Sequence, residues 1–334
     1  MTLLVRDEAD IIDAHVAFHL NLGVDLIIAM DHRSEDGTSE ILEGYERDGY
    51  VQLIRQEAKE VRQSSWVTGM ARLAATEHRA DWVINSDADE FWWPRATTLK
   101  EAIGAVPPAY GVVYAPMCYF LPRPGAGEFF ERMTIRLLQT APINNPLSRY
   151  RPSPKAAHRA NPHVVVRRGN HQVEGAGRRL SSWHPLELLH FPDRSPDQVA
   201  RKYENTVASW PSRGREPGAF VLAAHTSVEQ VGASEAFEQR QLDHDDLADA
   251  AAAHTVVADT RVRDVLRRLR STTGAFRRPP EFNGLLAPST PSALDEARHA
   301  VDVAVLAEAD LIRLHREVDD LDRRLQTLGA GRTD

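Results

Sequence analysis

The residues best suited to chemistry are the acidic cluster Asp87-Ala88-Asp89-Glu90. It follows Asp81-Trp82-Val83-Ile84-Asn85, a segment that we expect to be a strand. Alternate carboxylates on an extended chain project to one side, about 6–7 Å apart, and are costly to bury as ions without a cation. Mg²⁺ or Mn²⁺ suits this arrangement, because both ions bind carboxylate and phosphate oxygens. A solvated acidic turn is the alternative, but the aromatic run Phe91-Trp92-Trp93 that follows argues against full exposure.

The elements that must position this cluster are predicted by the first ninety residues. Short apolar runs alternate with amphipathic stretches, which is typical of βαβ units in a mainly parallel sheet. Ligands bind at the carboxyl ends of the strands in such sheets, and Asp87 stands at such an end. The expected strands are Thr2–Val5, Asp25–Met30, Val51–Ile54 and Asp81–Asn85, and the expected helices are Ala9–Leu22, Gly37–Arg47 and Glu60–His78.

The rest of the chain changes character twice. From about Tyr110 to His190, strand-like pieces separated by Pro- and Gly-rich loops predict a mixed extension of the sheet with long functional loops. After Ser195 the pattern is helical. The strand-like pieces are Val112–Phe120, Met133–Leu138, His163–Arg167 and Leu186–Phe191. We expect a catalytic domain over 1–215, a helical extension over 216–273, a linker over 274–291 and a C-terminal helix over 292–330.

The C-terminal helix carries apolar residues that alternate by three and four positions, as in a heptad seam. Two interpretations stay open: a helix packed on its own domain, or a short coiled coil that joins two copies into a homodimer. Three heptads are a marginal length for a free-standing coiled coil. The seam residues are Leu311, Leu314, Val318, Leu321, Leu325 and Leu328.

Composition excludes several classes of function. The chain has 334 residues and a net charge of −8, so it lacks the basic excess of a protein that grips nucleic acid over a broad face. Cys118 is the only cysteine, which excludes an internal disulfide and a multi-cysteine zinc site. The N-terminus does not read as a signal peptide, and no run approaches the roughly 20 apolar residues of a membrane span. We expect a cytoplasmic protein that touches the inner face of a membrane at most.

Several motifs, in this order, resemble glycosyltransferase family 2-like enzymes, and in particular the branch described as family-2-like or family-92-like. They are Arg6–Asp10, Phe18–Asp25, Asp31-His32-Arg33-Ser34-Glu35-Asp36-Gly37-Thr38, Asp81–Phe91 with its Asp-Ala-Asp-Glu-Phe ending, Gly169-Asn170-His171 and Leu189–Ser195. The resemblance spans about residues 2–210 and does not cover the C-terminal hundred residues.

The resemblance implies an α/β GT-A fold, which is a Rossmann-like mixed sheet flanked by helices, here with a helical C-terminal extension. It also implies a metal-dependent glycosyltransferase that moves a sugar from a nucleotide-diphosphate donor to an acceptor hydroxyl, with inversion. UDP is the expected nucleotide by family habit only. The acceptor would be a glycan, a lipid-linked molecule or a small molecule.

The resemblance also assigns roles at the matched positions. Asp31 would accept a hydrogen bond from the base, and Glu8 would support the nucleoside. Asp87 would hold ribose or metal, and Asp89 and His190 would hold the metal, with the imidazole favouring Mn²⁺ over Mg²⁺. Glu90 would orient the cluster or cap the following turn. A packed structural histidine is the alternative for His190, and an N-terminal helix cap the alternative for Asp31.

Counter-charges for the diphosphate are expected from a basic region between Arg149 and Arg179 and from the segment after it. An ordinary solvated basic loop is the alternative. The preferred phosphate contacts are Lys155, Arg194 and Lys202.

An inverting transfer needs a base for the acceptor hydroxyl, and the usual acidic pair of the family has no clear counterpart in this chain. The candidate carboxylates are Glu174, Asp193 and Glu128, and His171 is the alternative as base or as acceptor ligand.

Three rival functions share some of these features. A sugar nucleotidyltransferase would need a Gly-rich loop near the N-terminus, and Thr2–Asp10 contains no glycine. A non-catalytic sugar-nucleotide binder or scaffold has no use for an unpaired acidic cluster. A sugar-nucleotide hydrolase differs from a transferase by turning over donor without acceptor.

Overall fold

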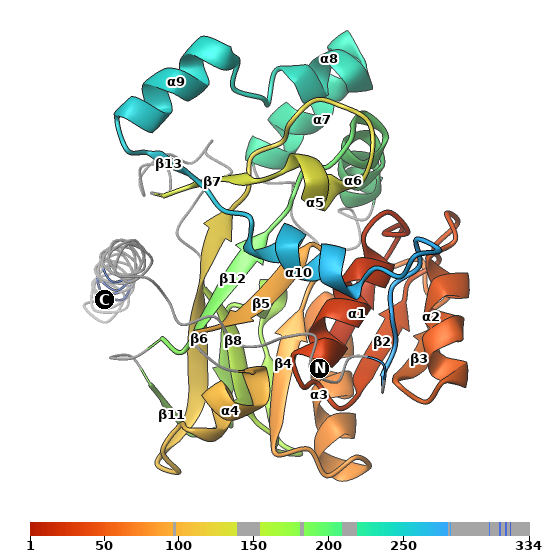
Figure 1. The fold of residues 1–334 in the computed structure, drawn as a ribbon. Coiled ribbons are helices and arrows are strands. Elements are labelled where there is room, and N and C mark those ends of the chain that lie inside the picture. Colours follow the sequence, from red (N-terminus) through yellow and green to blue (C-terminus); the bar gives the residue numbers. More distant parts are fainter. Residues whose placement is uncertain are drawn as a thin grey trace, which may run out of the picture.

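The computed structural model describes residues 1–95, 98–138, 154–180, 184–208, 219–279 and 281, with Ala307, Leu314, Val318 and Leu321. Its centre is a nine-stranded mixed sheet, in which β3-β2-β1-β4-β8-β6-β12-β5 are neighbours and β11 pairs with β6 (Figure 1). Strands β1 to β4 are parallel, and β8 runs antiparallel to both of its neighbours. The strands are β1 (Thr2–Val5), β2 (Ile27–Asp31), β3 (Val51–Arg55), β4 (Trp82–Ser86), β5 (Glu90–Pro94), β6 (Tyr110–Tyr119), β8 (Pro154–Arg159), β11 (Arg178–Arg179) and β12 (Leu186–His190).

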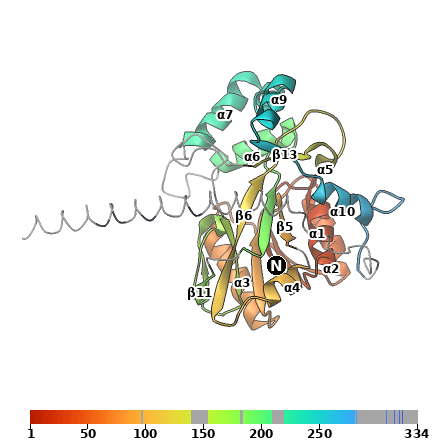
Figure 2. The ribbon, with the colours of Figure 1, turned by 60° about the vertical axis from the view of Figure 1, so that its left-hand side comes forward.

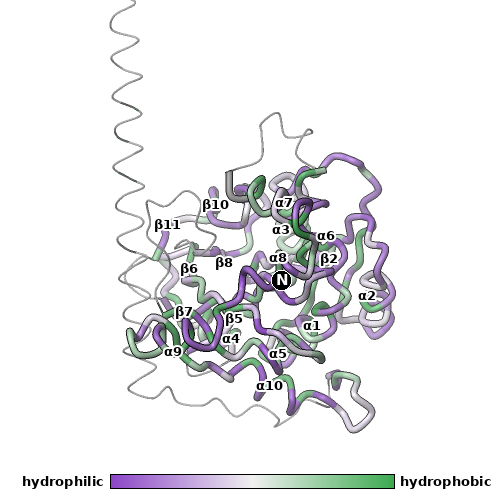
Figure 3. The backbone as a smooth tube through the Cα atoms, turned by 90° about the horizontal axis from the view of Figure 1, so that it is seen from above, coloured by the Kyte–Doolittle hydropathy of each residue, from purple (hydrophilic) through white to green (hydrophobic). Residues whose placement is uncertain are grey.

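Helices cover both faces of this sheet because its strands are apolar on both sides. In β2, Ile27 and Ala29 join the core under α1 (Ile12–Asn21) and α2 (Thr38–Arg47), whereas Ile28 and Met30 join the core under α3 (Gln63–Thr76). Helices α4 (Leu99–Gly104) and α10 (Arg261–Leu269) lie on the first face. Along α2 the tube in Figure 3 changes between green and purple, as expected of a helix with one buried stripe.

A group of helices lies at one end of the sheet in both ribbon views (Figures 1 and 2). It contains α6 (Pro196–Ala208), α7 (Ala219–Val231), α8 (Ala233–Glu238) and α9 (His244–Ala252). Its small core of Val199, Tyr203, Ala224 and Phe237 is separate from the two cores of the sheet. Short elements complete the description: α5 (Phe129–Arg132), β7 (Ile135–Leu137), β9 (Val165–Val166), the 3₁₀ turn η1 (Arg168–Asn170), β10 (Val173–Glu174) and β13 (Val256–Ala258).

A buried ionic network joins the C-terminal part of this fold to the sheet. Glu187 on β12 accepts from Arg95 at 3.1 Å and from Arg261 at 2.5 Å. Asp259 accepts from Arg261 at 2.7 Å and from Arg136 at 2.9 Å. The network ties α10 and the end of β13 to β12 and β7.

The predicted fold class, a mixed sheet flanked by helices with a helical extension, is confirmed. The sequence prediction missed β5, α4, β8 and β13. Among the described residues, no helix is long and apolar enough to cross a membrane. The predicted linker over 274–291 is described only to residue 279 and at 281, where Arg278 lies 3.9 Å from the centre of the Tyr45 ring. The predicted helix over 292–330 lies outside the described residues, apart from four positions.

Candidate active site

The acidic cluster forms the turn that carries the chain from β4 to β5. The backbone N–H of Asp87 donates to Glu90 Oε2 at 3.1 Å, and that of Glu90 donates to Asp87 O at 3.2 Å. Strand β5 then pairs with β12, so that Glu90 lies opposite His190. The N–H of Phe191, just after β12, donates to Asp89 O at 2.8 Å. Residues separated by a hundred positions in the sequence are thus fixed against one another by backbone pairing.

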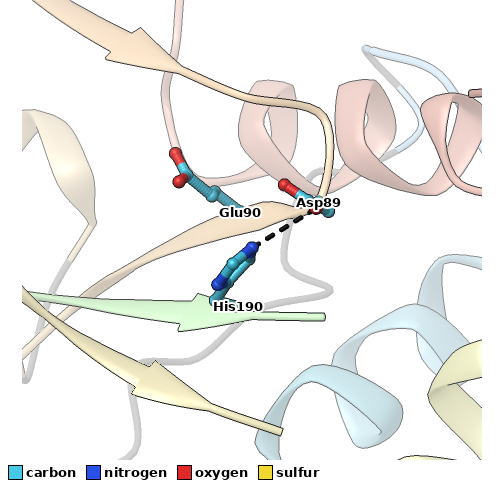
Figure 4. A group of neighbouring side chains, drawn as sticks. All are labelled: Asp89, Glu90 and His190. Carbon is cyan, nitrogen blue, oxygen red and sulfur yellow. Dashed lines mark ion pairs between the residues drawn. The ribbon is translucent and has the colours of Figure 1, made fainter. Parts of the chain in front are cut away.

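Asp89, Glu90 and His190 form a triad that fits a divalent cation (Figure 4). Each offers one ligand atom, and these atoms lie within 4.8 Å of one another. His190 Nε2 is 3.3 Å from Asp89 Oδ2, and its Nδ1 is buried without a hydrogen-bond partner among the described residues. Two carboxylates and an imidazole suit Mn²⁺, and the orphaned ring nitrogen leaves the histidine with unused capacity for a ligand.

Asp87 lies next to this triad but is held by other groups. Lys155 Nζ, on β8, is 2.6 Å from Asp87 Oδ2 and 2.8 Å from Glu90 Oε1. Asn170 Nδ2 donates to Asp87 Oδ1 at 3.3 Å. Burial opposes the charge on Lys155, but Asp87 and Glu90 raise the pKa of its ammonium above the ordinary value. Burial raises the pKa of Glu90 to about 8, and Lys155 works against that rise.

Lys202 neutralises the other end of the cluster. From α6, its Nζ donates to Asp89 Oδ2 at 2.8 Å and to Pro192 O at 3.0 Å. Burial would raise the pKa of Asp89, but Lys202 and His190 hold it well below the ordinary value. Asp89 therefore remains ionised.

A cavity of about 230 Å³ opens beside Lys202 at the carboxyl ends of β1 and β2. Its charged and polar lining comes from the segment after β1, from His32 after β2, and from α6. This is the edge at which open α/β sheets bind ligands. The polar lining residues are Arg6, Asp7, Glu8, His32, Gln63, Gln198, Arg201, Lys202, Asn205 and Thr206.

Arg194 is buried and joins α6 to the end of β1. Its guanidinium donates to Glu8 at 2.5 Å, to Asp10 at 2.7 and 2.8 Å, and to Phe191 O at 3.2 Å. Burial raises the pKa of Glu8 to about 7, and Arg194 opposes that rise. Arg194, expected as a phosphate contact, thus donates its hydrogen bonds to protein oxygens, whereas Glu8, expected to support the nucleoside, lines the cavity.

Asp31 ends β2 but does not line the cavity. Its carboxylate accepts hydrogen bonds from the hydroxyls of Ser34, at 2.5 Å, and Ser39. The N-cap position of α2 is Gly37, and Asp36, one residue before it, accepts from Thr38 N at 3.1 Å. The neighbouring His32 reaches the cavity instead, and its Nε2 lies 2.7 Å from Ala58 O.

The candidate bases are placed differently. His171 is half-buried, and its Nδ1 is 2.9 Å from Pro154 O, next to Lys155. Burial and then Lys155 lower the pKa of His171 below 6.5, whereas Asp87 raises it, so the imidazole lies close enough to the cluster to sense its charges. Glu174 is exposed on β10 and pairs with Arg167 at 2.7 Å.

The other two carboxylates are also accounted for. Asp193 is buried, lies 3.9 Å from Arg240 and is close enough to Lys202 to raise the pKa of its ammonium group. Glu128 pairs with Arg270 at 2.5 Å, away from the cluster. Of the four candidates, only His171 and Asp193 lie near the acidic cluster.

Sequence reasoning missed Glu90 as a candidate metal ligand and Asn170 as the partner of Asp87. The sequence prediction did not identify the aromatic run after the acidic cluster as a strand. Pairing of that strand with the predicted strand at 186–191 is what brings Glu90 opposite His190. Asn170 stood inside a noted motif, and asparagine is among the residue types that tolerate its backbone angle φ of +60°, but nothing in the sequence predicted its contact with Asp87.

Comparison with known proteins gives one match in sequence. The family model described as Glycosyltransferase family 92 matches residues 3–112, which include the cavity-lining segment after β1 and the acidic cluster. No curated protein is significantly similar to the chain.

Among solved structures, the chain is similar to Staphylococcus aureus TarS. TarS 1–349 with UDP is 13% identical, with 94% of this chain and 90% of that chain covered and a TM-score of 0.31. TarS 1–349 with UDP-GlcNAc is 12% identical over the same shares, with a TM-score of 0.32. A longer TarS structure is 13% identical over 92% of this chain and 54% of that chain, also with a TM-score of 0.32. TM-scores this low do not establish equivalent positions.

The matching family model is that of family 92, not family 2, and it covers about a third of the chain. It covers the part of the chain in which the predicted motifs are densest. The predicted enzyme class is confirmed: this chain is a glycosyltransferase.

Proposed function

We propose that this glycosyltransferase takes its sugar from a nucleoside diphosphate donor, with UDP as the first nucleotide to test, and that the donor binds across the cavity and the acidic cluster. One observation carries the proposal: Lys202 lines the cavity and also donates to Asp89 at 2.8 Å. The ammonium group of Lys202 therefore lies between a polar cavity and a cluster of carboxylates. A donor with its nucleoside in the cavity and its sugar at the carboxylates would have its diphosphate at this ammonium group.

In this arrangement the nucleoside occupies the cavity, with Glu8, His32 and Asn205 around it. The diphosphate meets Lys202, and the transferred sugar lies toward Asp87. Lys155 is buried between two carboxylates, so its role in this proposal is to neutralise Asp87 and Glu90 rather than to contact phosphate.

A divalent cation, Mn²⁺ or Mg²⁺, would be held by Asp89, Glu90 and His190. The donor set supports it, because Asp89, Glu90 and His190 offer two carboxylate oxygens and a ring nitrogen within 4.8 Å of one another, and a bound cation would favour the ionised form of Glu90. When bound, the ion would offset the negative charge of the diphosphate and of the leaving group.

For the transfer, the acceptor hydroxyl oxygen attacks the anomeric carbon as the bond from that carbon to the phosphate oxygen breaks. The electron pair of the broken bond leaves with the nucleoside diphosphate, and the configuration inverts. We assign the hydroxyl proton to His171. Its position supports this assignment: the His171 ring lies beside the acidic cluster, where burial, Lys155 and Asp87 shift its pKa, and its Nδ1 is 2.9 Å from Pro154 O.

The test is calorimetric titration of UDP into the full-length chain with and without Mn²⁺. Lys202→Met should weaken UDP binding about tenfold or more and leave uridine binding nearly unchanged, because the ammonium contacts the diphosphate. Lys100→Met is the matched control, since Lys100 pairs with Asp25 on an exposed surface. If the wild-type protein binds no nucleoside diphosphate, with or without Mn²⁺, the proposal is wrong.

We also propose that the C-terminal seam joins two copies of the chain. Leu314, Val318 and Leu321 follow one another by four and three residues and are 49%, 54% and 57% exposed. Apolar residues at heptad spacing and half open to solvent support a helix that pairs with a second copy rather than with its own domain.

A further inference from the structure

The turn Arg168–Asn170 contains two successive residues in the left-handed region. Gly169 has φ +73° and Asn170 has φ +60°. A side chain on Gly169 would bring its Cβ within 2.6 Å of the His171 ring, so only glycine fits there. Asparagine tolerates a positive φ better than most residues, but the conformation still costs energy, and such residues cluster at functional sites.

Several contacts fix this turn. The N–H of Gly169 donates to Gln63 Oε1 at 3.4 Å, and Gln63 lines the cavity. The N–H of Asn170 donates to Arg167 O at 3.0 Å. The turn therefore has a defined position between the cavity and the acidic cluster.

The carboxamide of Asn170 is buried, with 1% of the residue exposed, and only one of its two polar atoms has a hydrogen-bond partner among the described residues. Its nitrogen donates to Asp87 Oδ1 at 3.3 Å, and its Oδ1 has no hydrogen-bond partner among the described residues. The orientation is fixed by chemistry, because an ionised carboxylate can only accept. The orphan atom is therefore an acceptor, and a buried acceptor without a partner is costly.

We propose that Asn170 is a specificity-determining residue whose Oδ1 accepts a hydrogen bond from a sugar hydroxyl of the donor. The assignment rests on the proposed function. The missing partner must carry a donor hydrogen, which excludes phosphate and carboxylate oxygens. Asp87 beside it is a second acceptor, so the pair suits two hydroxyls on one sugar ring. The hydroxyls come either from the ribose or from the transferred sugar.

The test uses Asn170→Gly, because glycine adopts the left-handed conformation without strain and removes only the carboxamide. Asn161→Gly, in the turn before β9, is the matched control; Asn161 accepts from His163 N at 2.8 Å. Binding of UDP, UDP-glucose and UDP-GlcNAc is measured by calorimetry with Mn²⁺ constant, after folding is checked by circular dichroism.

Asn170→Gly should weaken binding by roughly three- to tenfold, the usual effect of one hydrogen bond. A loss already seen with UDP assigns the hydroxyl to the ribose, whereas a loss seen only with the UDP-sugars assigns it to the transferred sugar. In the ribose case, 2′-deoxy-UDP or 3′-deoxy-UDP binds wild type more weakly than UDP does, and the variant no longer distinguishes them. That comparison in the wild type needs no variant.

A folded Asn170→Gly protein with wild-type affinity for all three ligands overturns the inference and leaves the proposed function intact. Wild-type protein that binds none of the three overturns both. The two failures are therefore distinguishable by the wild-type titration alone.

Discussion

Glu90 and His190 face each other across the antiparallel pair of β5 and β12. Directly opposed residues in such a pair place their side chains on the same face of the sheet. Asp89 stands one residue before Glu90, at the point where the turn from β4 enters β5, and completes the triad. The geometry of the metal candidate is thus set by backbone register, which explains why residues from distant parts of the chain can be held within 4.8 Å.

The first prediction concerns the role of His190 as a metal ligand. His190→Ala should weaken Mn²⁺ and UDP binding together by at least 10–100-fold, since even an indirect partner of a metal ligand contributes that much. Calorimetric titration of Mn²⁺, and of UDP at constant Mn²⁺, provides the measurement. His78→Ala is the control, because His78 is exposed and contacts Gln52 at 2.6 Å. Unchanged affinities in a folded variant would make His190 a packing residue.

The second prediction tests the base. His171→Gln should lower kcat by about 10²–10⁴-fold and change UDP affinity by less than about threefold, because the imidazole acts on the acceptor proton. In the wild type, the acid limb of the pH–rate profile should lie below pH 6.5, since burial and Lys155 lower the pKa of His171. Exposed His163 gives the control variant, His163→Gln. If kcat of His171→Gln stayed within tenfold of wild type, Asp193 would replace His171 as the candidate base.

The third prediction concerns the buried network around Glu187. Glu187→Ala should destabilise the fold by about 3–5 kcal/mol, because Arg95 and Arg261 lose a shared buried partner. Urea unfolding at pH 7 gives the comparison. Glu43→Ala, which breaks an exposed pair with Arg55, should lose less than about 1 kcal/mol. Equal losses of unfolding free energy in the two variants would mean that the buried network contributes no more to stability than an exposed ion pair does.

The fourth prediction is a pH dependence of stability. His158 is buried on β8, and burial lowers the pKa of its imidazole to about 4, below the ordinary 6.5. Between these values the unfolded chain binds the proton and the folded chain does not, so stability is lost as the pH falls from 6.5 toward 4. His158→Leu should remove about 2 kcal/mol of the loss between pH 7 and pH 5.

Urea unfolding of both proteins at the two pH values measures this difference. His163→Leu is the exposed control and should keep the wild-type slope. An unchanged slope in His158→Leu would mean that the other buried histidines, such as His15 with its pKa lowered to about 3, carry the whole effect.

The fifth prediction concerns the seam. Truncation after Pro291 should halve the solution mass measured by light scattering and leave UDP affinity unchanged, because the cavity lies in residues 4–206. Leu314→Glu with Leu321→Glu in the full chain should likewise give a monomer, at the mass of one full-length chain. A full-length chain that is already a monomer would make the seam an internal packing face.

The sequence predicted the parallel half of the sheet well, because β1 to β4 are short apolar runs separated by amphipathic helices. It failed for β8, where Lys155 and His158 interrupt the apolar pattern. Both residues belong there for tertiary reasons that no local pattern carries: Lys155 neutralises two carboxylates, and His158 is buried between β4 and β6.

For the site, motifs and spacing identified the acidic cluster and His190 as candidate residues. They did not predict which side chains contact these residues. Asp87 faces Lys155 and Asn170, and Asp89 faces Lys202, through pairings that depend on how β8, the turn at Asn170 and α6 are placed around the sheet edge. Such pairings are long-range, so residue type alone could nominate Lys155 and Lys202 but not distinguish their roles.

The small separate core of α6, α7 and α8 has a consequence for motion. Local opening costs less free energy where few apolar side chains are buried, so this helical group should exchange its amide hydrogens sooner than the sheet does. Three side chains tie α6 and the residues before it to the edge of the sheet: Arg194 through Glu8 and Asp10, Lys202 through Asp89, and Asn205 through Asp7. If local opening of the helical group broke these contacts, one wall of the cavity would move away while the sheet stayed folded, and a spent nucleotide would have a way out.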